Sequence, residues 1–584
     1  MLSARRPPPP IAGETRLEVI CRRYRWFVVV AIVLAALWLR ACDLRADPPP
    51  DLSWSFAPYT DEALNSYSAR CLVLYGTWKV DDFFPFVVYP LTNLLTAGVM
   101  KVLGIGMVQL KLVSVIAGVL GIIAMYLLLR DSIGDIATQI GSLTLATSFP
   151  LVMYSRLGLI ETVQILFLLL AGVFWTRGLR RSWLMILCGF FAAGTIFLVK
   201  VSAIFIFPAM LVLFLWEWFS RQADPTQRRQ LFGALLWFLC GCLAAAAFWF
   251  ALVFLPYQNE YMRYLLRHSL ESPQGHPNTP LTYFFNTLAI GVQAGLWQRL
   301  LVVCLIGFTT LPLFLHSGSR AIRYLLCWLI FGTLMLGYMN YRPPRYEIVL
   351  IPCIIGGYAA ALSALLSTGT ILPVSKPSAL KWALYSVWLW PLGLHLLLKP
   401  SLFLAYRNPE HPPFFKPDGL LVGALAIAAA LAGAVHLVWR IANRGISINS
   451  LRIRYAVAAI IVLLATTGDT KQFVKWFSER THNIFSWSRE LDRQLPDSAV
   501  VAGAWAPTLM VESRKRAVAV TDWANIANPM SRFGITHLIL GQNQTDRDLA
   551  DSVGEQVLAN SLLRNRYLVR NRLVTQELIL LELR

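Results

Sequence analysis

The sequence has few charged residues for its length. Only 14% of its 584 residues are charged, whereas 57% are hydrophobic. A water-soluble chain of this size would have about a quarter of its residues charged. The low charge therefore excludes an ordinary soluble enzyme. The sequence also contains neither the GxxxxGK[ST] loop nor the GxGxxG motif with which many enzymes hold nucleotides.

The cysteines and the N-terminus exclude two further classes. None of the nine cysteines is in the CxxC spacing typical of metal sites. No small-residue cleavage site closely follows the first apolar run, so we expect that run to be a retained anchor rather than a cleaved signal. The chain is therefore not predicted to be a zinc protein or an ordinary secreted domain.

Apolar blocks of about twenty residues dominate the chain. Each is long enough to cross a hydrocarbon core about 30 Å thick as a helix. The formal net charge of +20 comes from Lys and Arg in short loops between these blocks. That placement is what membrane topology requires, and it argues against a nucleic-acid partner. The sequence thus predicts a multi-pass α-helical protein of the plasma (inner) membrane.

The positions of Lys and Arg predict which loops are cytoplasmic. Four arginines lie between residues 16 and 25, before the first span, so the N-terminus is predicted to be cytoplasmic. The basic loops that follow all fall on the same side if the stretch YPLTNLLTAGVMKVLG at 89–104 is an interfacial helix rather than a span. About thirteen spans result, and their predicted ranges are 26–42, 106–130, 138–155, 162–177, 183–199, 201–217, 231–255, 298–316, 324–340, 346–366, 381–397, 419–439 and 455–467.

An odd number of spans places the C-terminal tail outside the cell. In residues 468–584 the apolar runs shorten and the charge rises. SAVVAGAW, AVAVTDW, THLILG and ELILLEL have the composition of short strands, and DRDLADSVGEQVLANSLLRN has helical spacing. We therefore predict a cytoplasmic segment at 1–25, a transmembrane domain at 26–467 with an external loop at 43–105, and a small external α/β domain at 468–584.

Ionisable residues gather on the predicted external side. Such groups are costly at membrane depth, so each is a candidate functional residue. The candidates are Asp61, Glu62, Arg156, Glu161, Lys200, Arg267, His268, His276, Arg342 and Arg345, with Tyr346 beside the last. Each also has a structural interpretation: cations reach lipid head groups, and carboxylates begin helices. Together, the carboxylates suit proton removal and the cations suit a lipid-anchored phosphate.

Several stretches carry a resemblance to a known family. YTDEALNSYSARCLVLYGTW resembles the Asp-Glu motif that follows the first span in GT-C class glycosyltransferases, which use lipid-linked sugars. SRLGLIETVQILFLLLAGVFW, FLVKVSAIFIFP and PPRYEIVLIPCIIGGYAAAL are similar to later motifs of the family 39 type. That branch holds the protein O-mannosyltransferases and the lipid A aminoarabinose transferases. The resemblance runs through most of the chain and implies a bundle of about thirteen helices with a small external α/β domain.

The resemblance also implies an activity and a role for each residue. The chain would move a sugar, a hexose or a pentose, from a polyprenyl-phosphate donor to a hydroxyl of a lipid, protein or glycan, with inversion. Asp61 would be the base, with Glu62 or Glu161 as a second carboxylate. The residues expected to bind the donor phosphate are Lys200, Arg345, Tyr346, Arg342 and Arg156, and the loop candidates are Arg267, His268 and His276.

One departure from the family leaves the metal question open. The family's interfacial segment has Lys or His before Pro-Pro-Leu, whereas this chain has Val88-Tyr89-Pro90-Leu91. No other cofactor is implied, but Asp61 and Glu62 have the chemistry to hold a divalent metal. The main alternative function is a transporter or flippase of a lipid-linked glycan precursor. A glycan ligase or polymerase and a non-enzymatic scaffold are weaker alternatives.

Overall fold

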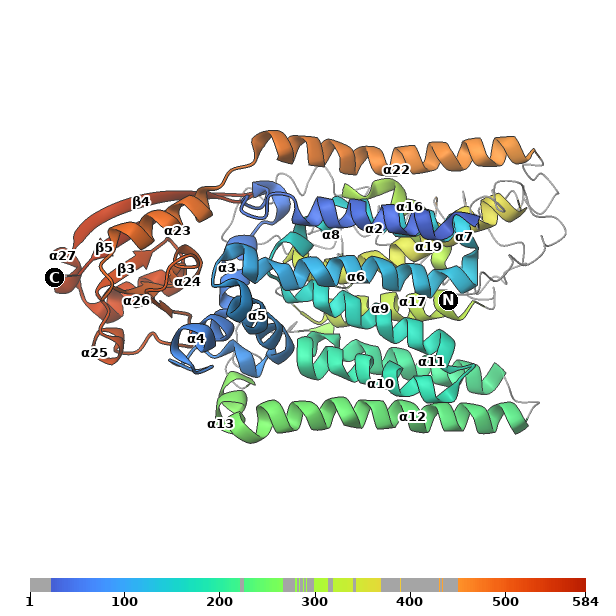
Figure 1. Cartoon of the computed structure of the whole chain (residues 1–584), viewed down its shortest axis with the longest axis horizontal. Helices are drawn as coiled ribbons and strands as arrows, with labels where there is room; N and C mark the ends of the chain where they lie inside the picture. The colour runs from blue at the N-terminus through green and yellow to red at the C-terminus, as the bar shows by residue number, and fades with distance from the viewer. Residues whose placement is uncertain are drawn as a thin grey trace, which may run out of the picture.

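The computed structural model describes residues 23–220, 225–265, 299–312, 319–339, 343–368 and 450–583, with single positions between 279 and 433. A bundle of long helices forms one part of the molecule, and a small α/β domain lies at one end of it (Figure 1). A short segment of the chain, coloured blue, lies between the two parts. This arrangement confirms the predicted fold class.

Helices make up the described part of the bundle. They are α2 (Arg25–Ala41), α6 (Met107–Ile133), α7 (Asp135–Thr147), α8 (Phe149–Arg156), α9 (Ile160–Gly178), α10 (Met185–Gly194), α11 (Ile206–Ser220), α12 (Pro225–Trp249), α13 (Leu255–Tyr264), α16 (Leu301–Thr310), α17 (Arg320–Gly337), α18 (Pro344–Glu347), α19 (Ile351–Thr368) and α22 (Leu451–Glu479). Within the described ranges, eight helical segments are long and apolar enough to span a membrane, or nine if α7 and α8 form one bent span.

The count of thirteen spans stays a prediction. Apart from single positions, the spans expected at 381–397 and 419–439 lie outside the described residues. The boundary predicted at 467 falls inside α22, which continues as one helix to Glu479.

Two buried polar side chains form hydrogen bonds with backbone groups at the break between α7 and α8, where the chain bends by 52°. Arg40 of α2 donates from Nη1 to the Ala146 carbonyl at 2.8 Å. Asp469 of α22 accepts from the Phe149 amide at 2.9 Å. Backbone groups freed at membrane depth must find such partners. These contacts tie the first and last described helices of the bundle to the bend, and α8 leads directly to the turn before α9.

The external segment predicted at 43–105 stays at one end of the bundle. It contains α3 (Ala57–Asn65), α4 (Tyr67–Tyr75) and α5 (Pro90–Leu103), all near the α/β domain in Figure 1. Helix α5 is the predicted interfacial segment, and its 14 residues are too few to span a bilayer. The basic residues at the end of α9 and the starts of α17 and α22 lie at the opposite end. The orientation of the bundle in the membrane stays a prediction.

The α/β domain has a five-stranded mixed sheet in the order β2-β1-β3-β5-β4. The parallel strands are β1 (Val500–Gly503), β2 (Arg516–Ala519) and β3 (His537–Leu540), and the antiparallel strands are β4 (Leu562–Arg570) and β5 (Thr575–Glu582). In the register, Val501 lies between Ala517 and His537, and Leu538 pairs with Leu581. The helices are α23 (Asn483–Gln494), α24 (Ala506–Leu509), α25 (Pro529–Phe533), α26 (Gln544–Val553) and α27 (Glu555–Ala559).

All four predicted strands are found where the apolar runs placed them, as β1, β2, β3 and β5. The long helix predicted over 546–565 is shorter than expected. Asn543 caps α26 by accepting from the Asp546 amide at 2.7 Å, and α27 ends at Ala559. The following residues enter β4, whose alternating pattern of burial was hidden by its arginines.

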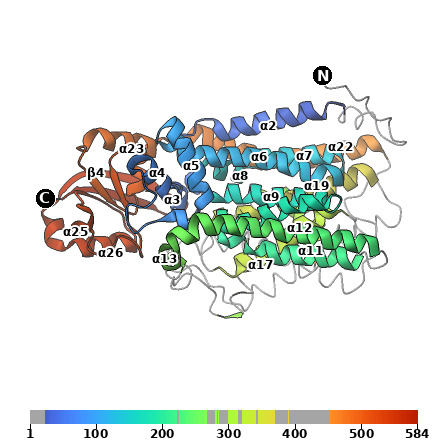
Figure 2. The ribbon, with the colours of Figure 1, turned by 60° about the horizontal axis from the view of Figure 1, so that its bottom comes forward.

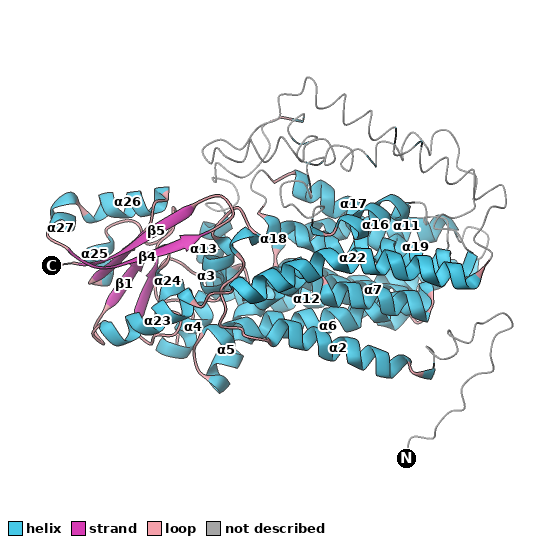
Figure 3. Cartoon of the chain, turned by 90° about the horizontal axis from the view of Figure 1, so that it is seen from above, coloured by secondary structure: helices cyan, strands magenta, loops and turns pink. Residues whose placement is uncertain are grey.

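The domain, the external segment and the start of α6 share one apolar core. Tyr59 and Met100 of the external segment and Leu110 of α6 pack with Trp505 and Leu509 of the domain. Figures 2 and 3 show α3 and α4 beside the domain from two further directions. The domain is therefore built onto the external segment rather than joined to the bundle by α22 alone.

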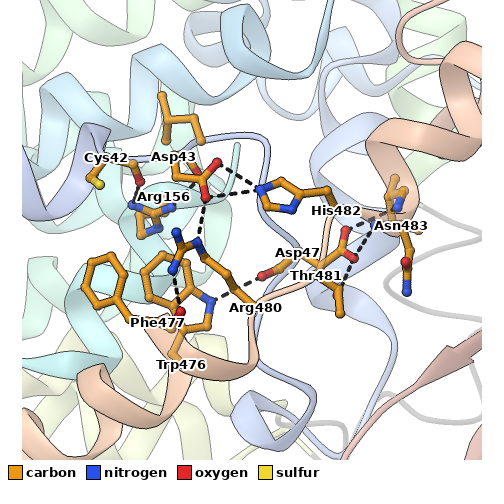
Figure 4. Close-up of polar contacts among 12 residues, drawn as sticks. Cys42, Asp43, Asp47, Arg156, Trp476, Phe477, Arg480, Thr481, His482 and Asn483 are labelled. Carbon is orange, nitrogen blue, oxygen red and sulfur yellow. Dashed lines mark hydrogen bonds and ion pairs between the residues drawn. The ribbon is translucent and has the colours of Figure 1, made fainter.

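A polar junction lies where the first and last described helices leave the bundle (Figure 4). Asp43 follows α2 with φ of +54°, and its carboxylate lies 2.8 Å from Arg480 Nε and 3.0 Å from His482 Nε2. Asp47 accepts from Thr481 Oγ1 and the Asn483 amide, both at 2.7 Å. The second contact begins α23. The junction thus fixes the α/β domain to the exit of α2.

Asp546 makes the stability of the α/β domain depend on pH. Burial raises the pKa of its carboxyl to about 6. Because the folded state favours the protonated form, the carboxyl contributes stability at low pH that is lost as the pH rises from about 4 through 6. We expect the domain to unfold at a lower temperature as the pH rises over this window. Its free energy of unfolding should fall by at most about 3 kcal/mol. Asp546→Asn should flatten that dependence. An unchanged profile in the variant would exclude Asp546 as its cause.

Candidate active site

Four candidate residues from four segments meet at the end of the bundle that carries the α/β domain. Asp61 lies in α3, and Glu161 lies in the first turn of α9, where the helix dipole favours a carboxylate. Lys200 is extended, with φ of −159°, between a π-helix at Thr195–Val199 and a 3₁₀ helix at Val201–Phe205. Arg345 lies in α18, directly after Pro343 and Pro344.

These four side chains form a continuous series of ion pairs. Arg345 Nη2 lies 2.6 Å from Asp61 Oδ2, and Arg345 Nε lies 3.5 Å from Glu161 Oε1. The same Glu161 oxygen lies 2.7 Å from Lys200 Nζ. We call Asp61, Arg345, Glu161 and Lys200 the charge cluster. Two carboxylates and two cations balance formally, which makes burial of the four charges tolerable.

Tyr346 forms one side of the charge cluster. Lys200 Nζ lies 3.6 Å from the centre of its ring, and Arg345 Cζ lies 4.9 Å from it. Cations are attracted to the face of an aromatic ring. The ring therefore holds both cations in place, and five of the predicted site residues lie together: Asp61, Glu161, Lys200, Arg345 and Tyr346.

Asp61 is the most accessible member of the charge cluster. Its side chain is 20% exposed, whereas those of Glu161, Lys200 and Arg345 are 2%, 8% and 9% exposed. Burial raises the pKa of the Asp61 carboxyl above its usual range, and the Arg345 guanidinium opposes that rise. Glu161 Oε2 accepts no hydrogen bond from the described residues. The cluster thus has one carboxylate open to an incoming group and another held inside.

Glu62 points away from the charge cluster. Its Oε1 lies 3.7 Å from Lys111 Nζ of α6, and its Oε2 accepts from the Gly158 amide at 3.2 Å. Lys111 Nζ also donates to the Leu44 carbonyl at 3.0 Å. Consecutive residues of a helix project in different directions, which separates Glu62 from Asp61. Glu62 therefore joins α3 to α6 and to the turn before α9.

Arg156 also lies outside the charge cluster. Its Nη1 donates to the Leu39 carbonyl at 3.0 Å and its Nη2 to the Asp43 carbonyl at 2.8 Å, so it satisfies the end of α2. Its guanidinium lies 4.4 Å from the centre of the Trp476 ring (Figure 4). This placement gives Arg156 a structural task. Its predicted contact with phosphate stays untested.

The remaining candidates lie outside the described residues, namely Arg267, His268, His276 and Arg342. Among the residues that the structure does describe, no three His, Cys, Asp or Glu side chains gather as a metal site would require. Asp61 and Glu62 project to different cations, so as a pair they do not fit a single metal ion.

Sequence reasoning did not identify three residues at or beside the site. Lys111 is hidden in an apolar run as the buried partner of Glu62. Tyr89 stands where the family has a cation, and burial raises the pKa of its hydroxyl, with further contributions from Tyr264, Tyr346, Glu161 and Asp61. Tyr264 ends α13 and packs in one apolar cluster with Val88, the residue before Tyr89. The departure from the family motif was the only signal for Tyr89.

Comparison with known proteins confirms the predicted resemblance. Residues 87–249, which include Glu161 and Lys200, match the family described as dolichyl-phosphate-mannose-protein mannosyltransferase. The fold is similar to that of ArnT from Cupriavidus metallidurans bound to undecaprenyl phosphate, with 16% identity, a TM-score of 0.53, and coverage of 96% of this chain and 98% of that one. For ArnT in the apo state the values are 17%, 0.52, 96% and 98%. No curated protein matches the chain in sequence. The chain thus has a GT-C fold.

Lys111 provides a test of the structural task of Glu62. We expect Lys111→Met to destabilise the protein in detergent by about 3 kcal/mol, because Glu62 is left buried without its cation. The double variant Lys111→Met/Glu62→Gln should recover part of that loss. Lys101→Met, at an exposed position of α5, is the matched control and should unfold like the wild type. A double variant no more stable than Lys111→Met would contradict the pairing.

Proposed function

We propose that this chain is an integral-membrane glycosyltransferase that moves a sugar from a polyprenyl-phosphate donor to an acceptor hydroxyl, with inversion. The observation that carries the proposal is the charge cluster, which lies at one end of a bundle with a GT-C fold. The match of residues 87–249 to a family of sugar transferases supports the same reaction class.

Lys200 and Arg345 suit the phosphate of the donor. The phosphate gains negative charge as the glycosidic bond breaks, and cations fixed in advance stabilise that charge in a site of low dielectric constant. Glu161 lies against both cations and fixes them before a donor arrives. Tyr346 holds their other side. We therefore assign the donor phosphate to this half of the cluster.

Asp61 suits the acceptor. Arg345 contacts its Oδ2, while Oδ1 faces the Thr60 hydroxyl at a longer distance of 3.4 Å. With 20% of its side chain exposed, the carboxylate can receive a proton from an incoming hydroxyl. As the hydroxyl oxygen forms its bond to the anomeric carbon, the bond to the phosphate oxygen breaks. The polyprenyl phosphate leaves on the opposite face, which inverts the anomeric centre.

The finer assignments belong to the same proposal. The donor sugar is a hexose or a pentose, and the acceptor is a lipid, a protein or a glycan. The protein lies in the plasma membrane with the α/β domain and the charge cluster outside the cell. The separation of the basic loops from the charge cluster along the bundle supports this orientation.

The direct test is release of the lipid product. The purified protein, in liposomes with an extract of the cell envelope as acceptor, should release undecaprenyl phosphate from one of a panel of labelled undecaprenyl-phosphate sugars. Transfer of label to the extract should equal that release. Movement of the labelled lipid across the bilayer without release would instead identify the flippase.

Asp61→Asn should abolish this transfer. We expect the rate at saturating donor and acceptor to fall by about a hundredfold or more, because the amide cannot accept the proton. Binding of undecaprenyl phosphate should be retained. Asp51→Asn changes an exposed carboxylate of the same segment outside the cluster, and it should leave the rate unchanged. Full activity of Asp61→Asn would remove Asp61 as the base.

Arg345→Gln should weaken the binding of undecaprenyl phosphate. We expect a loss of about tenfold or more, because a charged hydrogen bond to phosphate contributes about 1.5–3 kcal/mol. The measurement is a titration of the detergent-solubilised protein with undecaprenyl phosphate. Arg130→Gln, at the far end of α6, is the control and should bind like the wild type. Wild-type affinity in Arg345→Gln would argue against the phosphate site.

A further inference from the structure

The α/β domain contacts α3, the helix that carries Asp61, and α4, which follows it. Arg70 of α4 donates from Nη2 to the carbonyls of Ser513 at 2.7 Å and Lys515 at 2.9 Å. Tyr67 donates to the Ala517 carbonyl at 2.7 Å, and Tyr59 of α3 donates to the Arg570 carbonyl at 3.1 Å. Three side chains within ten residues of Asp61 are thus bound by backbone groups of the domain.

One loop of the domain reaches further toward the site. We call residues 521–528, between β2 and α25, the domain loop. Asn525 has φ of +62°, a conformation that asparagine tolerates better than most residues. Its side chain donates to the Ala519 carbonyl at 2.8 Å and accepts from the Asp82 amide at 2.9 Å. Arg532, just beyond the loop, pairs with the Asp82 carboxylate at 2.8 Å. The loop is therefore fastened to the segment between α4 and α5.

Trp523 is the side chain that this loop presents. Its ring lies 4.7 Å from that of Tyr264, edge to face, and 5.8 Å from that of Phe83. It packs against two separate apolar clusters, one around Tyr67 and Phe83 and one around Phe86 and Tyr264. Such aromatic contacts each contribute about 0.5–1.5 kcal/mol beyond burial. Trp523 thus joins the domain to the end of α13.

Tyr264 connects Trp523 with the segment before α5. Its side chain is buried and packs in one apolar cluster with Val87 and Val88, the two residues before Tyr89. Tyr89 directly precedes α5. Burial raises the pKa of both tyrosine hydroxyls, and the charge of the Asp61 carboxylate contributes to the rise. Trp523 and Tyr264 thus join the domain loop to the residues that lead into α5, and Leu64, three residues after Asp61 in α3, packs against the other cluster that Trp523 contacts.

We propose that Trp523 is a positioning residue for the acceptor, holding Tyr264 and the segment before α5 on the domain side of Asp61. The inference rests on the proposed function and assigns a task to the α/β domain within it. The donor phosphate is assigned to Lys200 and Arg345, which belong to the bundle, whereas Trp523 belongs to the domain at the end of the molecule. An acceptor hydroxyl must come within a few ångströms of Asp61, so a displacement of the domain side of the site affects placement of the acceptor first.

The test separates use of the acceptor from use of the donor. Full-length protein in liposomes is supplied with the labelled undecaprenyl-phosphate sugar that the wild type uses and with increasing amounts of envelope extract. Trp523→Ala should raise the amount of extract that gives half-maximal transfer by about tenfold, since two aromatic contacts are lost. The half-saturating donor concentration and the binding of undecaprenyl phosphate should change less than twofold. Trp523→Phe should recover most of the loss.

Leu549→Ala is the matched control. Leu549 of α26 is buried in an apolar cluster whose members all belong to the α/β domain. Its loss should lower the unfolding temperature as Trp523→Ala does, without changing use of the acceptor. Wild-type use of the extract by Trp523→Ala, or an equal loss in donor and acceptor use, would overturn the inference while the transferase stands. A wild type that releases no undecaprenyl phosphate from any donor would overturn the proposed function itself.

Discussion

The bundle must hold two cations and two carboxylates in a place where none of them is stable alone. Asp61, Arg345, Glu161 and Lys200 come from four segments of the chain, and their ion pairs with one another join those segments. An unpaired charge in such a site costs several kcal/mol, so the folded bundle has to bring all four segments together. The requirement that stabilises the fold also produces a site in which cations and an accessible carboxylate are fixed in advance.

The second constraint is the apolar core that the external segment and the start of α6 share with the α/β domain. Tyr59, Met100 and Leu110 pack with domain residues, and Arg70 binds the domain's backbone. The segment that carries Asp61 thus packs against both the bundle and the α/β domain. The buried pair of Glu62 and Lys111 fixes the same segment from the bundle side. The position of Asp61 is therefore fixed by contacts with both the domain and the bundle. A general base needs a fixed position because it must stay at a set distance from the reacting atoms.

Much of this arrangement was predictable from local patterns. Blocks of apolar residues predicted the spans, the short length of 89–104 predicted an interfacial helix, and β-branched runs predicted β1, β2 and β3. The boundaries around Asn543 and Leu562 were missed, because a cap and a turn ended a helical pattern that the composition would have continued. The residues of the charge cluster were identified because ionisable groups are rare in such a chain. Tyr89, Tyr264 and Trp523 were not, because aromatic residues are common in membrane proteins.

The sequence by itself determined the class of protein, the end of the bundle at which the ionisable residues gather, and the kinds of group available there. Those properties follow from hydrophobicity and charge, which act residue by residue. Only the tertiary structure decided that Asp61 faces Arg345 while its neighbour Glu62 faces Lys111, and that Arg156 binds the end of α2. Which partner a buried charge finds depends on the packing of helices far apart in the chain, and no local pattern records that packing.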